Sequence, residues 1–293
     1  MVLGAPLDGA ADGYRPTATL TFVTELRRQA SRGRTQLTLG LMALLPLIIL
    51  VAFEFGRSNG GGGGGSRGRF AALADIATSG GLNFALFTLL VSASFLLVVV
   101  VALFCGDTVA SEAGWASLRY LLAAPVPRAR LLRQKLAVAG FYSVVAVISL
   151  PLMSLLAGTV VFGWHPLRLP GTGAVLGSGV AVGRMGIVLA YVLATELVVA
   201  GLAFLLSVST DSPLGAVGGA VGLVIVSDIL DAVTALGGWR RVLPSHWQFA
   251  WLDAMQPQVS WGGMLEGAAV SVSYALVLFA LAFRHFRGKD IVS

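Results

Sequence analysis

The sequence is poor in the residues that build disulfides and metal centres. It contains one cysteine, Cys105, and three histidines, His165, His246 and His285, which lie far apart and form no His-Glu-x-x-His motif. An intramolecular disulfide is therefore excluded, and we expect no metal centre built from cysteine and histidine side chains. Cys105 ends an apolar run, so we expect it to be a small buried side chain.

A phosphate-binding loop is also absent. Its pattern, Gly-x-x-x-x-Gly-Lys-Ser/Thr, places a lysine after a glycine-rich loop, and neither of the two lysines, Lys135 and Lys289, follows one. We therefore expect that the chain does not hydrolyse ATP and holds no cofactor. A membrane enzyme of another kind would need a nucleophile or a metal cluster. Gly177-Ser178-Gly179 matches a serine hydrolase element only superficially, because no strand–turn–helix pattern flanks it.

Charged residues are scarce, at 12% of the chain, whereas hydrophobic residues make up 56%. Too few polar side chains are present to coat a soluble particle of 293 residues, so the composition predicts an integral membrane protein surrounded by lipid. The net charge of +6 is better explained by basic loops that stay in the cytoplasm than by nucleic-acid binding. We expect no nucleic-acid partner.

Long apolar runs predict the architecture. A membrane-spanning helix needs about 20 apolar residues, and six segments qualify. We therefore predict an all-α integral membrane protein whose six-helix transmembrane domain occupies residues 36–286. The third span is long for one crossing, and Pro151 offers a place to bend. The predicted spans are 36–54, 82–104, 136–164, 185–207, 214–236 and 263–283.

The flanking segments differ in character. Residues 1–16 contain no apolar stretch, so we expect a disordered tail and no secretory signal peptide. Residues 17–35 predict an amphipathic elbow helix, because apolar side chains such as Leu26 recur at helical spacing opposite charged side chains such as Glu25. The alternative is a merely basic flank of the first span. Residues 287–293 are expected to form a cytoplasmic tail.

The distribution of basic residues predicts the orientation. With a cytoplasmic amino terminus, the inner segments carry 13 Lys and Arg residues and the outer segments carry 7. This excess favours two cytoplasmic termini in a bacterial cytoplasmic membrane. On the outer side, Gly60–Gly65 is expected to be a mobile tether that leads to a short helix near residues 67–79. Residues 237–262 hold four of the six tryptophans, so we expect one or two short helices in the outer headgroup layer.

Three acidic residues lie away from the ends of the predicted spans. Glu196 is near the middle of span four, where an ionised side chain costs about 2.5–3.5 kcal/mol on insertion scales. It is expected either to hydrogen-bond a neighbouring helix or second subunit as a protonated acid, or to take part in a transport path. Asp228 and Asp231 lie three residues apart on one face of span five, nearer its outer end. We expect these two to belong to a pathway or gate.

The most informative segment lies between spans two and three. Residues 106–128 read Gly-Asp-Thr-Val-Ala-Ser-Glu-Ala-Gly-Trp-Ala-Ser-Leu-Arg-Tyr-Leu-Leu-Ala-Ala-Pro-Val-Pro-Arg, and further basic residues follow. One alternative is that this segment is basic only to fix the orientation of the chain in the membrane. That role requires arginines but no ordered Pro-Val-Pro turn. Because the segment does contain Pro-Val-Pro, we expect a structured cytoplasmic loop here.

This segment resembles the cytoplasmic coupling segment of ABC-2 type transporter permeases. In that family an acidic residue, a glycine and a Leu-Arg-x-Leu-Leu stretch precede a Pro-Val-x-Arg turn and a basic helix start. Weaker likenesses are Glu25-Leu26-Arg27-Arg28 in the elbow and Leu243-Pro244-Ser245-His246-Trp247 before span six. The chain departs from the family at Trp115-Ala116, where Gly-Thr is frequent. The resemblance implies a permease of the type V exporter-like architecture.

The resemblance also implies partners and a function. It implies a second permease, identical or homologous, and two copies of a separate ATP-binding subunit that would hold ATP and Mg. The expected function is to form the substrate pathway and to couple ATP hydrolysis to export. The alternative is an ion- or proton-coupled secondary transporter that uses Glu196 with Asp228 or Asp231 as a carboxylate relay. The implied ATPase-coupling interface consists of Asp107, Glu112, Gly114, Leu118, Arg119, Leu122, Pro125, Val126, Arg128 and Arg130.

Overall fold

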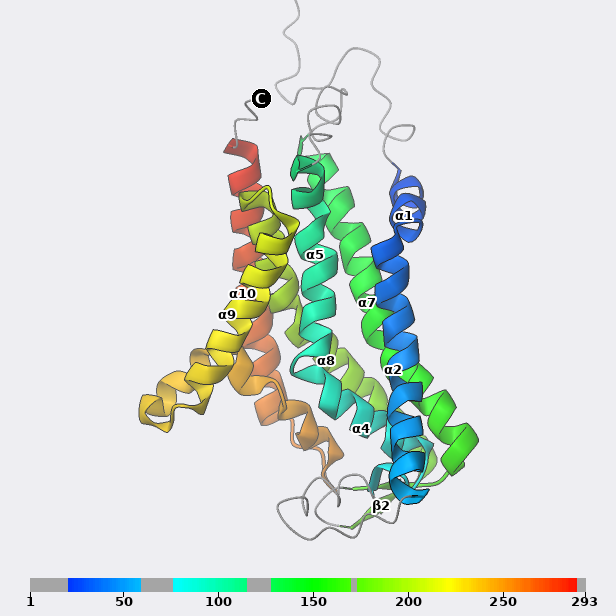
Figure 1. The fold of residues 1–293 in the computed structure, drawn as a ribbon. Helices are drawn as coiled ribbons and strands as arrows, with labels where there is room; N and C mark the ends of the chain where they lie inside the picture. Colours follow the sequence, from blue (N-terminus) through cyan, green and yellow to red (C-terminus); the bar gives the residue numbers. More distant parts are fainter. Residues whose placement is uncertain (1–20, 59–75, 115–127, 170–172, 289–293) are drawn as a thin grey trace, which may run out of the picture.

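The computed structural model describes most of the chain, and helices make up nearly all of that part (Figure 1). The exception is a short antiparallel ribbon of β1 (Leu167–Arg168) and β2 (Val175–Leu176). The all-α class predicted from the sequence is confirmed. The predicted tail 1–16, the Gly60–Gly65 tether and most of the predicted helix near residues 67–79 lie outside the described residues. The described ranges are 21–58, 76–114, 128–169 and 173–288.

Within the described residues, five helices are long and apolar enough to cross a membrane, and a bent pair of helices makes a sixth candidate if the pair is one span. The protein is therefore a multi-pass membrane protein. Each of the six predicted spans overlaps one of these elements. The five helices are α2 (Gly33–Ser58), α7 (Arg128–Phe162), α8 (Ser178–Ser209), α9 (Pro213–Ala232) and α10 (Gly262–Gly288), and the bent pair is α4 (Gly81–Ala93) with α5 (Leu96–Gly114).

The second predicted span is broken, which corrects the expectation of one helix over residues 82–104. The chain bends by 61° between α4 and α5. Ser92 and Ser94 lie beside the break, and small polar residues are common where helices kink. The Gln248 amide nitrogen donates to the carbonyl oxygen of Ala93 at 3.3 Å. This contact supplies a partner for a carbonyl group at the end of α4, where the helix leaves carbonyls unpaired.

The helices on either side of the expected cytoplasmic loop extend further than the sequence suggested. The loop was predicted over residues 105–135, but α5 continues to Gly114 and α7 begins at Arg128. Only residues 115–127 separate the two helices, and they lie outside the described part of the chain. α7 passes through Pro151 as one helix of 35 residues, so its first turns extend beyond the predicted span.

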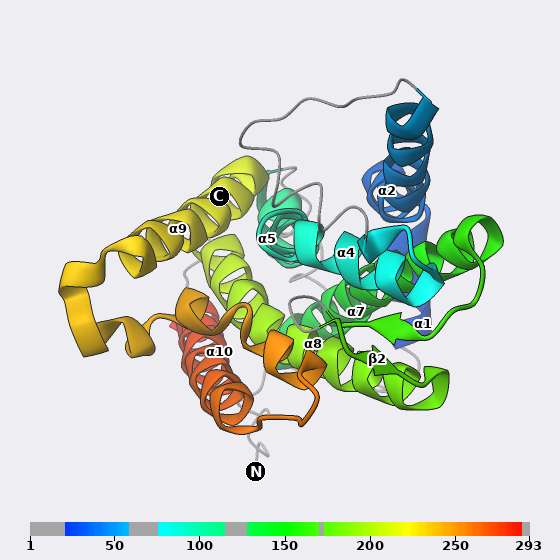
Figure 2. The same ribbon diagram turned by 90° about the horizontal axis from the view of Figure 1, so that it is seen from below.

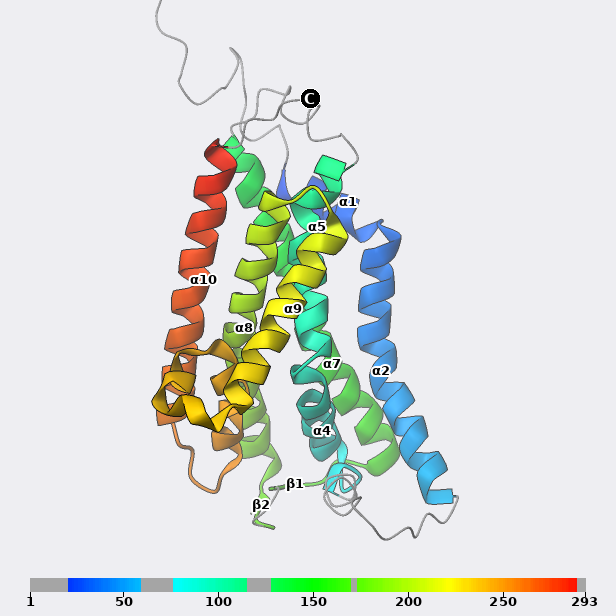
Figure 3. The same cartoon turned by 60° about the vertical axis from the view of Figure 1, so that its left-hand side comes forward.

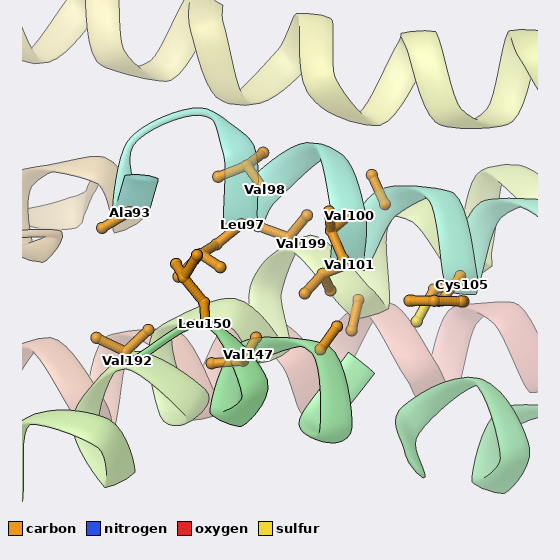
Figure 4. Packing of buried hydrophobic residues seen from close by; sticks show 14 of the residues in the cluster. Ala93, Leu97, Val98, Val100, Val101, Cys105, Val147, Leu150, Val192 and Val199 are labelled. Atoms are coloured by element: carbon orange, nitrogen blue, oxygen red, sulfur yellow. The ribbon is translucent and has the colours of Figure 1, made fainter. Parts of the chain in front are cut away.

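The core lies where α8 packs against α10 on one side and α5 on the other, as the view along the bundle shows (Figure 2). Leu97 and Val101 of α5 approach Leu150 of α7 in the same cluster, together with Val192 and Val199 of α8 (Figure 4). Lipid is as apolar as these side chains, so close packing between the helices, more than hydrophobic burial, holds them together.

The two ends of the bundle carry different elements (Figure 3). The elbow helix α1 (Phe22–Ala30) lies at the end where α10 finishes, which we call the elbow end, and the β-ribbon lies at the opposite, ribbon end (Figure 1). Between α9 and α10 the chain forms three short 3-10 helices, where the sequence predicted one or two short helices. They are η1 (Thr234–Val242), η2 (Pro244–Trp247) and η3 (Ala250–Met255).

The tryptophans of this region divide into two groups. Trp247 and Trp251 are buried within the protein, whereas Trp239 and Trp261 are exposed. The four tryptophans were the reason to expect short helices in the outer headgroup layer. Two of them pack inside the protein instead, with Trp251 only 1% exposed, so these two do not support that expectation. The position of the segment relative to the membrane stays a prediction.

Candidate functional site

A network of charged side chains joins the elbow helix to three other helices at the elbow end. Its three acidic members come from α1 and α5, and its four basic members come from α1, the turn after it, α2 and α7. We call this set the elbow network. It consists of Glu25, Arg28, Arg32, Arg34, Asp107, Glu112 and Lys135.

Lys135 of α7 occupies the centre of the elbow network and is only 3% exposed. Its Nζ lies 2.6 Å from Oε1 of Glu112 and 3.4 Å from Oε1 of Glu25. Arg28 bridges the same two acids, since Nη2 donates to Oε1 of Glu112 at 3.0 Å and Nη1 donates to Oε2 of Glu25 at 3.3 Å. Nη2 of Arg32 lies 3.8 Å from the same Oε1 of Glu112. Glu25 is therefore paired with two cations and Glu112 with three, as burial of charge requires.

Asp107 is the second buried acid that α5 contributes. Arg34 at the start of α2 donates to its Oδ1, and Nη1 of Arg32 lies 3.5 Å from its Oδ2. The three arginines border a polar cavity of about 470 Å³, and Glu112 of α5 also lines it. The Tyr142 hydroxyl of α7 adds a bond to the carbonyl oxygen of Leu26 in α1 at 2.8 Å. Helices α1, α2, α5 and α7 are thus tied together at one point.

The predicted coupling residues do not all share one environment. Asp107 and Glu112 were expected in a loop, but both lie on α5 with their side chains buried in the elbow network. Gly114 ends α5, Arg128 begins α7, and Arg130 is partly buried on α7. The remaining predicted coupling residues lie outside the described part of the chain, so their role stays a prediction. They are Leu118, Arg119, Leu122, Pro125 and Val126.

Five members of the elbow network, among them Glu25, Arg34 and Lys135, were not predicted as site residues from the sequence. Glu25 was placed on the water-facing side of the elbow helix, which was wrong, because Glu25 and Gln29 are buried. Glu25 follows Phe22 by three residues and precedes Gln29 by four, so the helical spacing does place all three near one face. Arg34 and Lys135 carried no comparable signal, since their partners come from distant parts of the chain.

A second candidate site is a cavity of about 250 Å³ within the membrane domain, formed by α5, α8, α9, α10 and η2. Its wall is mostly aliphatic, and two acidic side chains, one from α8 and one from α9, face the same space. Among the described residues that line it, none is lysine, arginine or histidine. Its polar lining residues are Thr195, Glu196, Ser227, Asp228, Ser245, Gln248 and Tyr274.

Glu196 is the most buried acid of this cavity, with 7% of the residue exposed. Its Oε2 makes no hydrogen bond with any described residue. Buried polar atoms almost always have a partner in folded proteins, so an orphaned carboxylate oxygen beside a cavity needs an explanation. No hydrogen bond to a described residue of a neighbouring helix is present at this oxygen, and the two other possibilities, a hydrogen bond to a second subunit and a role in a transport path, stay predictions.

Asp228 and Asp231 have different surroundings although they are one helical turn apart. Asp228 lines the cavity with Glu196. Asp231 instead pairs with the segment after α9: Nε of Arg240 donates to its Oδ1 at 3.2 Å, and Nδ1 of His246 lies 2.7 Å from the same oxygen. Asp231 thus anchors η1 and η2 to α9, and Asp228 faces the cavity.

Residues 45–292 match a protein family described as "Protein of unknown function (DUF2705)". The chain belongs to the DUF2705 family. No curated protein matches the sequence. The DUF2705 match includes every residue that lines the membrane cavity, and it includes Asp107, Glu112 and Lys135 of the elbow network. The partners of these three in the elbow helix and the turn after it lie before the matched residues.

Proposed function

We propose that this DUF2705 protein is the transmembrane permease subunit of an ABC-2 type transporter. In this role it forms the substrate pathway and couples ATP hydrolysis by a separate nucleotide-binding subunit to export across the bacterial cytoplasmic membrane. One observation carries the proposal. The two helices that flank the ABC-2-like segment, α5 and α7, both enter the buried elbow network, so a force applied to residues 115–127 would reach four helices together.

The position of the membrane cavity supports this mechanism. Val98 of α5 forms one part of its wall, and α8, α9, α10 and η2 form the rest. If the ATPase moved α5 together with α1, α2 and α7, the wall from α5 would shift relative to the other walls. Binding of ATP can drive such a change only if it stabilises one arrangement more than the other. The elbow network would keep the moving helices together as a unit.

The proposal includes partners that this chain does not supply. Two copies of the ATP-binding subunit would hold ATP and Mg, and a second permease, identical or homologous, would complete the pathway. Gly218 and Gly222 lie one turn apart on α9, and no described heavy atom lies within 4 Å of the position that a Cβ would take at either residue. Such a small-residue face allows close approach of another membrane helix, which supports pairing through α9.

We propose that the elbow end is cytoplasmic. This orientation places the basic elbow network inside, in agreement with the positive-inside rule. A cysteine replacing Val175 in the exposed part of β2 should react with an impermeant thiol reagent in intact cells, and one replacing the exposed Arg133 of α7 should react only after lysis. The native Cys105 is buried and gives little background. Labelling of Arg133→Cys in sealed cells, with Val175→Cys protected, would reverse the proposed orientation.

The coupling function is tested by a change between α5 and α7. Truncating or charging a buried interface anchor costs about 2–5 kcal/mol. Leu122→Asp should therefore release the cognate ATPase during co-purification, or leave it bound with its hydrolysis uncoupled from transport in vesicles. Val175→Asp at the exposed ribbon end is the matched control. It should keep both the binding of the ATPase and the coupling of ATP hydrolysis to transport. If Leu122→Asp inserts normally and couples at the wild-type rate, residues 115–127 are not the docking segment.

A proton- or ion-coupled secondary transporter is the second candidate, because Glu196 and Asp228 line one cavity. The two functions differ in their energy source. Vesicles that contain this protein alone would transport in response to an ion gradient if the second candidate were correct. The ABC-2 function requires the ATP-binding subunit and ATP for the same transport.

A further inference from the structure

We propose that the membrane cavity binds an amphipathic organic cation, in which a quaternary or protonated amine is attached to an apolar group, and that Glu196 is its counter-ion. The ligand's role as an exported substrate rests on the proposed function. Its binding does not, because every residue that forms the cavity belongs to this chain.

The positive charge of the ligand is inferred from the charges of the cavity wall. Glu196 and Asp228 face the space, and the described lining residues include no basic side chain that could pair with either of them. Oε2 of Glu196 is buried and lacks a hydrogen-bond partner among the described residues. A cation in the cavity would supply the missing partner, and the attraction would be strong because the surrounding aliphatic wall screens charge weakly.

The rest of the wall indicates an organic cation more than a metal ion. Calcium and magnesium need six or more oxygen ligands. The described residues contain no group of three His, Cys, Asp or Glu side chains that could hold a metal. Aliphatic side chains can instead bury the apolar part of an organic ion, with a gain in free energy that rises with the buried area. The aliphatic lining residues are Val98, Val198, Val199, Leu202, Leu223, Val224 and Leu278.

The size of the cavity and the aromatic side chain in its wall narrow the class of organic cation further. A cavity of about 150 Å³ accommodates benzene, so about 250 Å³ leaves room for one ring and an attached ammonium group. Tyr274 of α10 is part of the wall, and aromatic faces attract quaternary ammonium groups. The described lining therefore combines the three features that recognise such an ion: a carboxylate without a partner, an aromatic ring and an aliphatic surface.

The test is direct binding to the purified permease in lipid nanodiscs without any ATPase. Radiolabelled benzyltrimethylammonium is the probe, and equilibrium dialysis gives its dissociation constant. We expect saturable binding that Glu196→Gln weakens at least about tenfold, because the amide keeps the shape of the side chain but removes its charge. Glu266→Gln makes the same chemical change at an exposed position of α10 that does not line the cavity, and it should bind as the wild type does.

Two further measurements follow. The first separates loss of the binding site from a folding defect, and the second tests whether the site selects positive charge. Leu202→Trp fills the cavity while leaving both acids in place, so it should abolish binding even though the protein stays monodisperse. Unlabelled benzyltrimethylammonium should displace the probe, whereas the anion benzenesulfonate should not. Displacement by benzenesulfonate, equal binding by Glu196→Gln, or an absence of saturable binding to the wild type would each overturn the proposal.

The binding result and the proposed function can fail separately. Saturable cation binding that depends on Glu196, in a protein that neither binds an ATPase nor transports with one, would retain this site and reject the ABC-2 function. ATP-driven transport of another substrate, with no binding of the probe, would reject the cation site and retain the ABC-2 function.

Discussion

Lys135→Met should lower the free energy of unfolding of the protein by about 3–5 kcal/mol, since breaking a buried ion pair is strongly destabilising. The substitution would leave the buried carboxylates of Glu25 and Glu112 with only partly exposed arginines as partners. Lys135 is almost completely buried and lies between the carboxylates of Glu25 and Glu112. Methionine fills a similar volume, so the loss of charge, more than a cavity, would cause the effect. The measurement is chemical or thermal unfolding of the detergent-solubilised protein, followed by the loss of the monodisperse species.

Two variants separate the charge effect from other causes. Arg133→Met removes a basic residue from the same helix at an exposed position, and it should change stability by less than about 0.5 kcal/mol. The double variant Lys135→Met/Glu112→Gln lacks both members of the 2.6 Å pair and should recover part of the lost stability. Equal stability of Lys135→Met and Arg133→Met would mean that the elbow network does not hold these helices together.

The positions of the crossings could be predicted because the thickness of the hydrocarbon layer imposes a minimum apolar length. The break in the second crossing could not. Residues 82–104 carry no charged side chain, and the contact from Gln248 to the Ala93 carbonyl joins residues 155 positions apart. A sequence window of helical length contains no information about such a partner.

The charged residues of the elbow end show a second limit of prediction from the sequence. The amphipathic pattern of residues 17–35 was interpreted with all charged side chains facing water, which fails when distant segments supply the opposite charge. Arg28 pairs with Glu112 across 84 positions and Glu25 pairs with Lys135 across 110. Local spacing can identify the buried face of a helix, but it cannot show that the face meets a buried lysine.

The membrane acids were found from the sequence because ionisable residues in apolar spans are rare and costly. Their separation into two roles required the fold. Asp228 and Asp231 share a helical face in the sequence, yet His246 and Arg240 pair with Asp231 while Asp228 faces the cavity. The wall of that cavity is assembled from five elements, which no local pattern could have brought together.

Gly267→Val should disrupt the wall of the membrane cavity from a position outside it. A Cβ at Gly267 in α10 would collide with the hydroxyl of Tyr191 and would lie 2.6 Å from Cβ of Trp247. The Tyr191 hydroxyl donates to the carbonyl oxygen of Trp247 at 2.7 Å, a bond that fixes the end of η2 against α8. Pro244 and Ser245 of η2 line the cavity, so displacement of Trp247 would move this wall.

The expected cost of the valine is about 3 kcal/mol of unfolding free energy, at the upper end of the usual range for overpacking, because the buried Tyr191 hydroxyl also loses its acceptor. Binding of benzyltrimethylammonium should weaken in the fraction that stays folded. Gly140→Val is the matched control, since no described heavy atom lies within 4 Å of a Cβ at that position of α7. Both variants carry the same helix-propensity change of a glycine-to-valine replacement, so only the difference between them reports the collision. A Gly267→Val protein with the stability and cation affinity of Gly140→Val would show that α10 does not hold η2 in place.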